Sequence, residues 1–193
     1  MNRRDALSRV ALLFGGTIIG AEFFLSGCKN PDAKAVSGAL DFSAENISFL
    51  DEVAETILPT TPSSPGAKAA KVGDFMKVMV TDCYDENDQK IFMEGIGKLD
   101  AGADKKYGKS FVKLSPEERK AFLIELDKEA KDYAGAKKAT DPNHYFSLMK
   151  QLTLLGFFTS EIGATKALRY VAVPGRFDGC VDYKKGDKAW ATS

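Results

Sequence analysis

From residue 43 onward, apolar residues return at intervals of three and four, as Ile47, Leu50, Ala54 and Ile57 do. This period places apolar side chains on one face of an α-helix, whereas a half-buried strand would alternate with a period of two. No strand pattern competes seriously, although residues 169–173 could be extended. The sequence therefore predicts an all-α fold.

Start and stop signals divide this pattern into about five helices. Pro59 and the prolines that follow it end the first helix, because proline lacks the amide that a helix interior needs. Ser115, Pro116 and Glu118 form a capping-box start for a later helix. We expect a single bundle around one core, with helices over residues 43–58, 72–83, 85–103, 115–133 and 141–158, a short helix over 161–170 and an irregular C-terminal tail from residue 171.

The fifth predicted helix is apolar on nearly every side, which indicates a central position in the bundle. Its expected buried stripe consists of Leu148, Leu152, Leu155 and Phe158. Its other sides carry Phe146, Met149 and Leu154.

The first 28 residues have the order of an export signal. The adjacent pair Arg3 and Arg4 precedes an apolar stretch over residues 10–25, and Leu-Ser-Gly-Cys follows, ending at Cys28. The arginine pair indicates the twin-arginine (Tat) route, which carries folded cargo, and the last four residues resemble a lipobox. The alternative is an uncleaved N-terminal helix in which these features coincide by chance.

The signal divides the chain into three expected parts. Residues 1–27 would be a signal helix that is removed, residues 28–42 a lipidated tether, and residues 43–193 the helical domain. Lipid on Cys28 would hold the domain at a membrane that faces the periplasm or the cell exterior, since a lipoprotein carries more than one acyl chain.

Charge and cysteine content limit the partners and the compartment. The 27 basic residues balance 27 acidic ones without forming a basic stripe, so nucleic acid is not an expected partner. With Cys28 committed to lipid, Cys83 and Cys180 remain, and an oxidising compartment favours a disulfide between them. The alternative is that Cys83, on the apolar face of the second predicted helix, is a small core residue and Cys180 a free thiol in the tail.

The sequence contains no recognisable catalytic, cofactor or metal motif. His144 is the single histidine and stands at the start of a predicted helix, where a solvated or cap-associated role is expected. Asp82, Asp85, Glu86 and Asp88 cluster, but a helix N-terminus explains acidic residues without catalysis. We therefore expect no catalytic, cofactor-binding or metal-binding residues in this chain.

Three segments together resemble the gluconate 2-dehydrogenase subunit 3 family. The first runs from Glu-Thr-Ile-Leu-Pro at residues 55–59 through Ser-Pro-Gly-Ala at 64–67 to Val-Gly-Asp-Phe-Met at 72–76. The second covers residues 152–163 and the third residues 168–175, near Cys180. In order and spacing these matches extend over residues 43–183.

The resemblance implies a small helical subunit of a membrane-associated, FAD-dependent sugar or alcohol dehydrogenase. The flavin would belong to a catalytic large subunit that resembles the glucose-methanol-choline oxidoreductases and is carried through Tat by the small subunit. In many such complexes electrons continue to a cytochrome subunit or to the quinone pool. The lipobox departs from a plain soluble member, and it would let this subunit tether the complex.

Two segments with non-periodic Pro, Gly and aromatic content are expected to contact the partner. They lie over residues 59–67 and 157–175, and the alternative is that they are ordinary loop and core. The candidate contact residues are Pro65, Gly66, Phe157, Phe158, Arg169 and Tyr170. A stand-alone envelope lipoprotein with a binding or structural role is the competing function, and an enzyme in its own right is a third.

Overall fold

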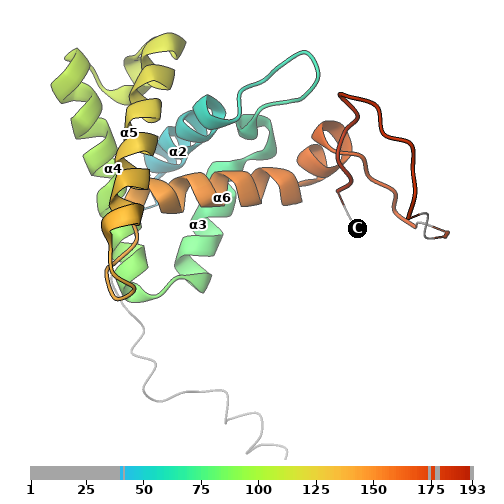
Figure 1. Ribbon diagram of the computed structural model, residues 1–193. Coiled ribbons are helices and arrows are strands. Elements are labelled where there is room, and N and C mark those ends of the chain that lie inside the picture. Colours follow the sequence, from blue (N-terminus) through green and yellow to red (C-terminus); the bar gives the residue numbers. More distant parts are fainter. Residues whose placement is uncertain (1–39, 41, 174, 177–178, 192–193) are drawn as a thin grey trace, which may run out of the picture. The chain divides into compact units, whose positions relative to one another are not determined.

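The computed structural model describes residues 40, 42–173, 175–176 and 179–191. The predicted signal and most of the predicted tether lie outside these residues. Five α-helices make up most of the described chain (Figure 1), with bounds α2 Ala44–Ile57, α3 Val72–Cys83, α4 Glu86–Tyr107, α5 Pro116–Ala136 and α6 Tyr145–Thr159. In the described part, β-structure is limited to two isolated bridges, so the predicted all-α class is confirmed. No helix there is both long enough and apolar enough to cross a bilayer.

The described chain also contains three short helical segments. Two are 3₁₀-helices, η1 Ala67–Ala70 and η2 Phe111–Lys113. The third is a single π-helical stretch, η3 Gly163–Ala167, which lies within the short helix predicted over residues 161–170.

Side-chain caps form at the predicted helix starts. The Ser43 hydroxyl accepts the Asn46 amide at 3.2 Å, and the Asp85 carboxylate accepts the Asp88 amide at 2.8 Å. At α5 the capping box is complete, with Ser115 and Glu118 satisfying each other's backbone amides. Local sequence thus fixes where these helices begin.

Helix α6 is the centre of the bundle, as predicted. It contacts α2, α3, α4, α5, η1 and η3. Its buried positions are Phe146, Leu148, Met149, Leu152, Thr153, Gly156 and Phe157. The central position is therefore confirmed, but only one side of the helix is buried.

The predicted stripe of α6 is wrong in its second half. Leu155 and Phe158 are 42% and 39% exposed, and Leu154 is also exposed. At about 100° per residue, Leu154 and Phe158 lie on the side of the helix opposite Met149 and Leu152, and Leu155 lies at the edge between the two sides. Leu154, Leu155 and Phe158 form an outward apolar face of α6.

The core is closed by aromatic rings from the ends of the elements. Phe111 of η2 packs between Phe49 and Phe122, with ring centroids 5.6 Å and 6.3 Å away. Phe42, which the sequence places at the end of the tether, is buried with its ring centroid 6.3 Å from that of Phe92. Among the described residues, the buried core therefore begins at Phe42, just before α2.

Small residues allow the closest helix contacts. A Cβ on Gly156 of α6 would lie 2.6 Å from the ring of Phe75 on α3, so a larger side chain would push the two helices apart. Gly73 of α3 lies against α2, where its amide donates to the Asp51 carboxylate at 2.8 Å. These contacts set the spacing of α3 against its two neighbours.

Candidate functional site

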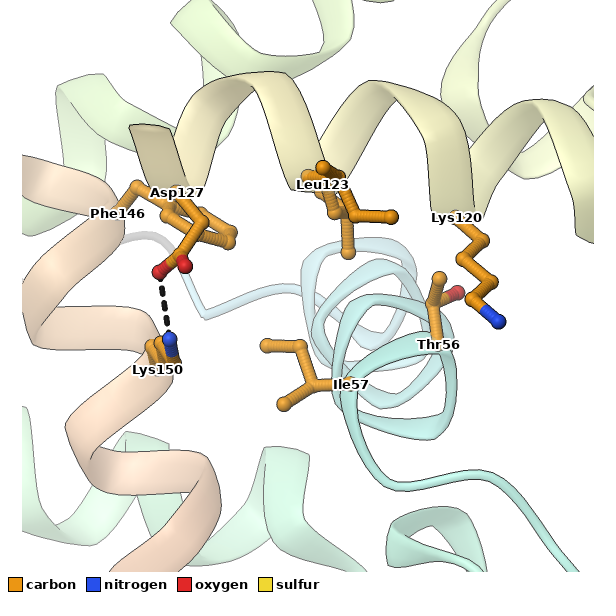
Figure 2. A pocket seen from close by; sticks show the side chains of 8 residues that line it. Thr56, Ile57, Lys120, Leu123, Asp127, Phe146 and Lys150 are labelled. Carbon is orange, nitrogen blue, oxygen red and sulfur yellow. Dashed lines mark hydrogen bonds and ion pairs between the residues drawn. The ribbon is translucent and has the colours of Figure 1, made fainter. Parts of the chain in front are cut away.

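The pocket in Figure 2 lies where α2, α5 and α6 meet, and its volume is about 230 Å³. Ile57, Leu123 and Phe146 supply apolar walls, while Thr56 and Lys120 lie toward one end. Its volume is below the roughly 300–1,000 Å³ of typical ligand pockets, so the hollow suits a contact surface better than a small-molecule site.

The one carboxylate that lines this pocket, that of Asp127, is already neutralised. The Asp127 carboxylate pairs with Lys131 at 2.7 Å and with Lys150 at 2.5 Å, the second pair joining α5 to α6. These two ammonium groups, Lys131 first, lower the pKa of Asp127. A carboxylate held ionised in this way is a weak base, so the pocket is poorly suited to proton abstraction.

A second hollow continues from the first and shares Thr56 and Lys120 with it. Here Glu52 of α2 binds Arg119 of α5 at 2.6 Å and also pairs with Lys68 of η1. Hydrogen bonding to Lys68, followed by the charges of Lys68 and Arg119, lowers the pKa of Glu52. These ion pairs join α2 to η1 and to α5, which is a structural role.

The predicted contact residues Pro65 and Gly66 lie in a loop that is folded onto Glu55. The Glu55 carboxylate accepts the Thr60 amide and hydroxyl, each at 2.8 Å, and the Lys68 amide at 2.9 Å. Gly66 is buried against this carboxylate, and an added Cβ would lie 2.1 Å from it. Pro65 is half-buried. Glu55, for which the sequence predicts no role, therefore determines the loop conformation.

The aromatic pair near the end of α6 is divided between core and surface. Phe157 is 3% exposed and belongs to the core, whereas Phe158 is 39% exposed on the outward face. Their rings meet edge to face at a centroid distance of 5.1 Å. Only Phe158 of this pair is accessible to a partner.

Arg169 and Tyr170 follow η3, and the structure gives them different surroundings. The Arg169 guanidinium lies 4.1 Å from the ring centroid of Trp190, and its Nε is buried with no hydrogen-bond partner among the described residues. Tyr170 is 47% exposed. Trp190 was not predicted as a site residue, although a single tryptophan in a polar tail is a signal that could have identified it.

His144 is the N-cap of α6. Its Nδ1 accepts the Phe146 amide at 3.3 Å, its Nε2 lies 3.7 Å from Glu129, and its ring stacks on Tyr145. Burial, followed by the charge of Glu129, raises the pKa of Tyr145 to about 12. The cap-associated role predicted for the single histidine is confirmed.

The predicted disulfide is not present, because Cys83 and Cys180 are both free and exposed. Cys83 has the angular position of the buried face of α3, but it is in the last turn, where residues 81–83 are all exposed. The helix projects beyond the core there, so the alternative of a core cysteine is also wrong. Cys28, the predicted lipidation site, lies outside the described residues, as do Arg3 and Arg4.

Within the described residues, no group of three His, Cys, Asp or Glu side chains is placed to hold a metal ion. Comparison with known families gives a match to the family described as gluconate 2-dehydrogenase subunit 3, over residues 44–175. That range contains all five described α-helices. No curated protein and no solved structure matches the chain.

Proposed function

The chain belongs to the gluconate 2-dehydrogenase subunit 3 family, and from this membership we propose that it is a non-catalytic small subunit of a FAD-dependent sugar or alcohol dehydrogenase. The observation that most strongly supports this proposal is the family match, which covers the whole helical bundle. The flavin belongs to a large subunit of the glucose-methanol-choline type, and this chain holds no cofactor itself.

The side chains that could perform acid–base chemistry support an accessory role. One ring nitrogen of His144 accepts a hydrogen bond that caps α6, and the Asp127 carboxylate is paired with two lysines. Apolar side chains on the outward face of α6 offer instead a surface for a partner protein.

We further propose that this subunit exports its partner through the Tat route and tethers it by lipid on Cys28. The motivation is the order Arg3-Arg4, apolar stretch, Leu-Ser-Gly-Cys. A route for folded cargo suits a flavoprotein that takes up its cofactor before export. The complex then faces the periplasm or the cell exterior.

The test is an affinity pull-down of the tagged full-length chain from native membranes, with a flavin absorbance spectrum and partner identification. We expect a flavin-bearing dehydrogenase. A colourless chain recovered alone would contradict the subunit role and favour an independent lipoprotein.

Export and tethering are tested separately. Replacing both Arg3 and Arg4 by Lys should remove the flavoprotein from the periplasm, whereas Arg9→Lys in the same leader is the matched control and should leave export unchanged. Cys28→Ser should release the exported complex from the membrane fraction, and Cys83→Ser should not. Unchanged membrane attachment in Cys28→Ser would contradict the lipid anchor.

A further inference from the structure

The described residues of 170–188, here called the C-terminal loop, leave and rejoin the fold at one point. The Arg169 amide donates to the Ala189 carbonyl, and the Ala191 amide donates to the Arg169 carbonyl, both at 2.8 Å. Arg169 stacks on Trp190, and the Lys188 ammonium donates to the Lys166 carbonyl at the end of η3. The base of the loop is therefore held by backbone and side-chain contacts together.

The C-terminal loop exposes apolar side chains that do not support the fold. Tyr170, Val171, Val173, Val181 and Tyr183 are all exposed, with Val173 at 82% and Tyr183 at 76%. Among the described residues, the core and the partly buried residues packed against it end at Ala167. Exposed apolar surface is unfavourable in water. A loop that is held together at its base and exposes several apolar side chains is therefore typical of an interaction element.

Two further properties limit what the loop can bind. The family match ends at residue 175, so most of the loop lies beyond the part of the chain shared with the family. Residues 169–191, the loop together with its base, contain five basic and three acidic residues, a formal charge of +2 on a chain whose total is zero. Like charge opposes pairing with a second copy of the loop, and the interspersed acids oppose binding to an anionic bilayer.

We propose that the C-terminal loop is a docking surface for the flavin-bearing large subunit, which would meet it with an apolar patch bordered by acidic residues. This inference rests on the proposed function. Tyrosine and valine at the centre with basic residues at the edge match the composition of protein interfaces. The Arg169–Trp190 contact acts as a positioning device, since a loop held in one conformation loses less entropy on binding.

The two exposed cysteines provide a test within the native chain. Cys180 lies in the loop and Cys83 at the end of α3, and both are free thiols. Alkylation by iodoacetamide is measured by peptide mass spectrometry on the isolated chain and on the purified complex, with flavin absorbance recorded on the same sample. We expect partner binding to slow alkylation of Cys180 by about tenfold or more while Cys83 reacts at its original rate, because alkylation requires an accessible thiolate.

The outcomes separate this inference from the function on which it rests. A complex that carries flavin but leaves Cys180 fully reactive, or protects Cys83 equally, overturns the docking loop and leaves the subunit role intact. Failure to recover any flavin-bearing complex overturns both.

Substitutions supply a second readout. Val173→Ser with Tyr183→Ser should weaken the Kd for the purified large subunit by about tenfold or more, as loss of central apolar contacts does. The control pair Val78→Ser and Val112→Ser removes apolar side chains that are 55% and 40% exposed on α3 and η2, and it should leave the Kd unchanged. Circular dichroism checks that both pairs fold.

The Arg169–Trp190 contact and the alternative binding partners of the loop are tested on the same protein. Trp190→Ala should weaken binding, and Trp190→Phe should largely restore it, because a phenyl ring can also stack with Arg169. An unchanged Kd in the Val173/Tyr183 pair overturns the proposal. If the same pair keeps its Kd but no longer binds phosphatidylglycerol vesicles, the loop binds a lipid surface instead. If it keeps its Kd but no longer self-associates, the loop binds a second copy of the chain.

Discussion

Two glycines of the bundle, Gly156 and Gly97, have opposite surroundings. A Cβ on Gly156 would lie 2.6 Å from the ring of Phe75, whereas a Cβ on Gly97, exposed on α4, would have no heavy atom within 4 Å. Gly156→Ala should therefore lower the free energy of unfolding by about 1–3 kcal/mol through overpacking. Gly97→Ala should raise it by about 0.5–1 kcal/mol, because glycine is a poor helix former.

Urea unfolding followed by circular dichroism measures both glycine variants under the same conditions. A Gly156→Ala protein as stable as the wild type would mean that the Phe75 ring moves aside without cost, and the close approach of α3 and α6 would not be a constraint.

Asp51 makes stability depend on pH. Burial, which outweighs the hydrogen bond from Gly73, raises the pKa of Asp51 above its ordinary value. Between the ordinary pKa and the raised one, the folded chain holds a proton that the unfolded chain has released, so this group's contribution to stability falls as the pH rises. Asp51→Asn keeps an oxygen that can accept the Gly73 amide and removes the titration.

Unfolding in urea from pH 3.5 to 6.5 should therefore show that the stability of Asp51→Asn relative to wild type increases with pH. Asp82→Asn is the control, because Asp82 is exposed at the other end of α3 and its charge is not one of those that act on Asp51. A constant difference between Asp51→Asn and wild type across this range would contradict the assignment.

Single residues also show where sequence reasoning stops. The capping box at Ser115 was predicted because capping depends on residues only three apart. The role of Glu55 was not, since it joins groups up to 13 positions away in the chain. Cys83 was placed on the correct face of α3 but not at its projecting end, because periodicity contains no information on where the neighbouring helices end.

At the scale of the element, the start of α5 relies on its capping box. Ser115→Ala removes the acceptor for the Glu118 amide and should lower the free energy of unfolding by about 1 kcal/mol. Ser48 is the matched control, because it is exposed inside α2 and caps nothing, so Ser48→Ala should change stability by less than about 0.5 kcal/mol. Thermal unfolding of the three proteins would distinguish these effects, and equal stability of both variants would show that α5 does not need its cap.

Helix α6 marks the limit of periodicity at this scale. Its apolar residues occur on every side, so the pattern predicted a central helix correctly but predicted a buried stripe that is wrong in its second half. The packing of α3, and of Phe75 against Gly156 in particular, determines that Leu155 and Phe158 face outward. Those exposed positions are where tertiary contacts, rather than local preference, decide the surface offered to a partner.

For the molecule as a whole, the helical bundle should not depend on the end of the chain. The core and its partly buried neighbours contain no described residue beyond Ala167. A chain ending at Gly175, where the family match ends, should therefore keep its cooperative unfolding, with a free energy of unfolding within about 1 kcal/mol of the wild-type value.

Differential scanning calorimetry measures this on the truncated and full-length proteins side by side. Loss of cooperative melting in the truncated chain would show that the Arg169–Trp190 contact stabilises the bundle and does more than hold the loop. The bundle and its family could be predicted from the sequence, because both depend on patterns within residues 43–175. The closure of the loop could not, because Arg169 and Trp190 are far apart in the chain and share no repeating pattern.

The meeting of Arg169 with Ala189 and Ala191 has a consequence for how such proteins diversify. Because the loop starts and finishes at the same place, insertions or deletions between these points change neither the path of the helices nor the composition of the core. The loop can therefore be lengthened, shortened or replaced as one segment without a change in the helical bundle. Grafting it onto another member of the family would transfer whatever partner preference it encodes.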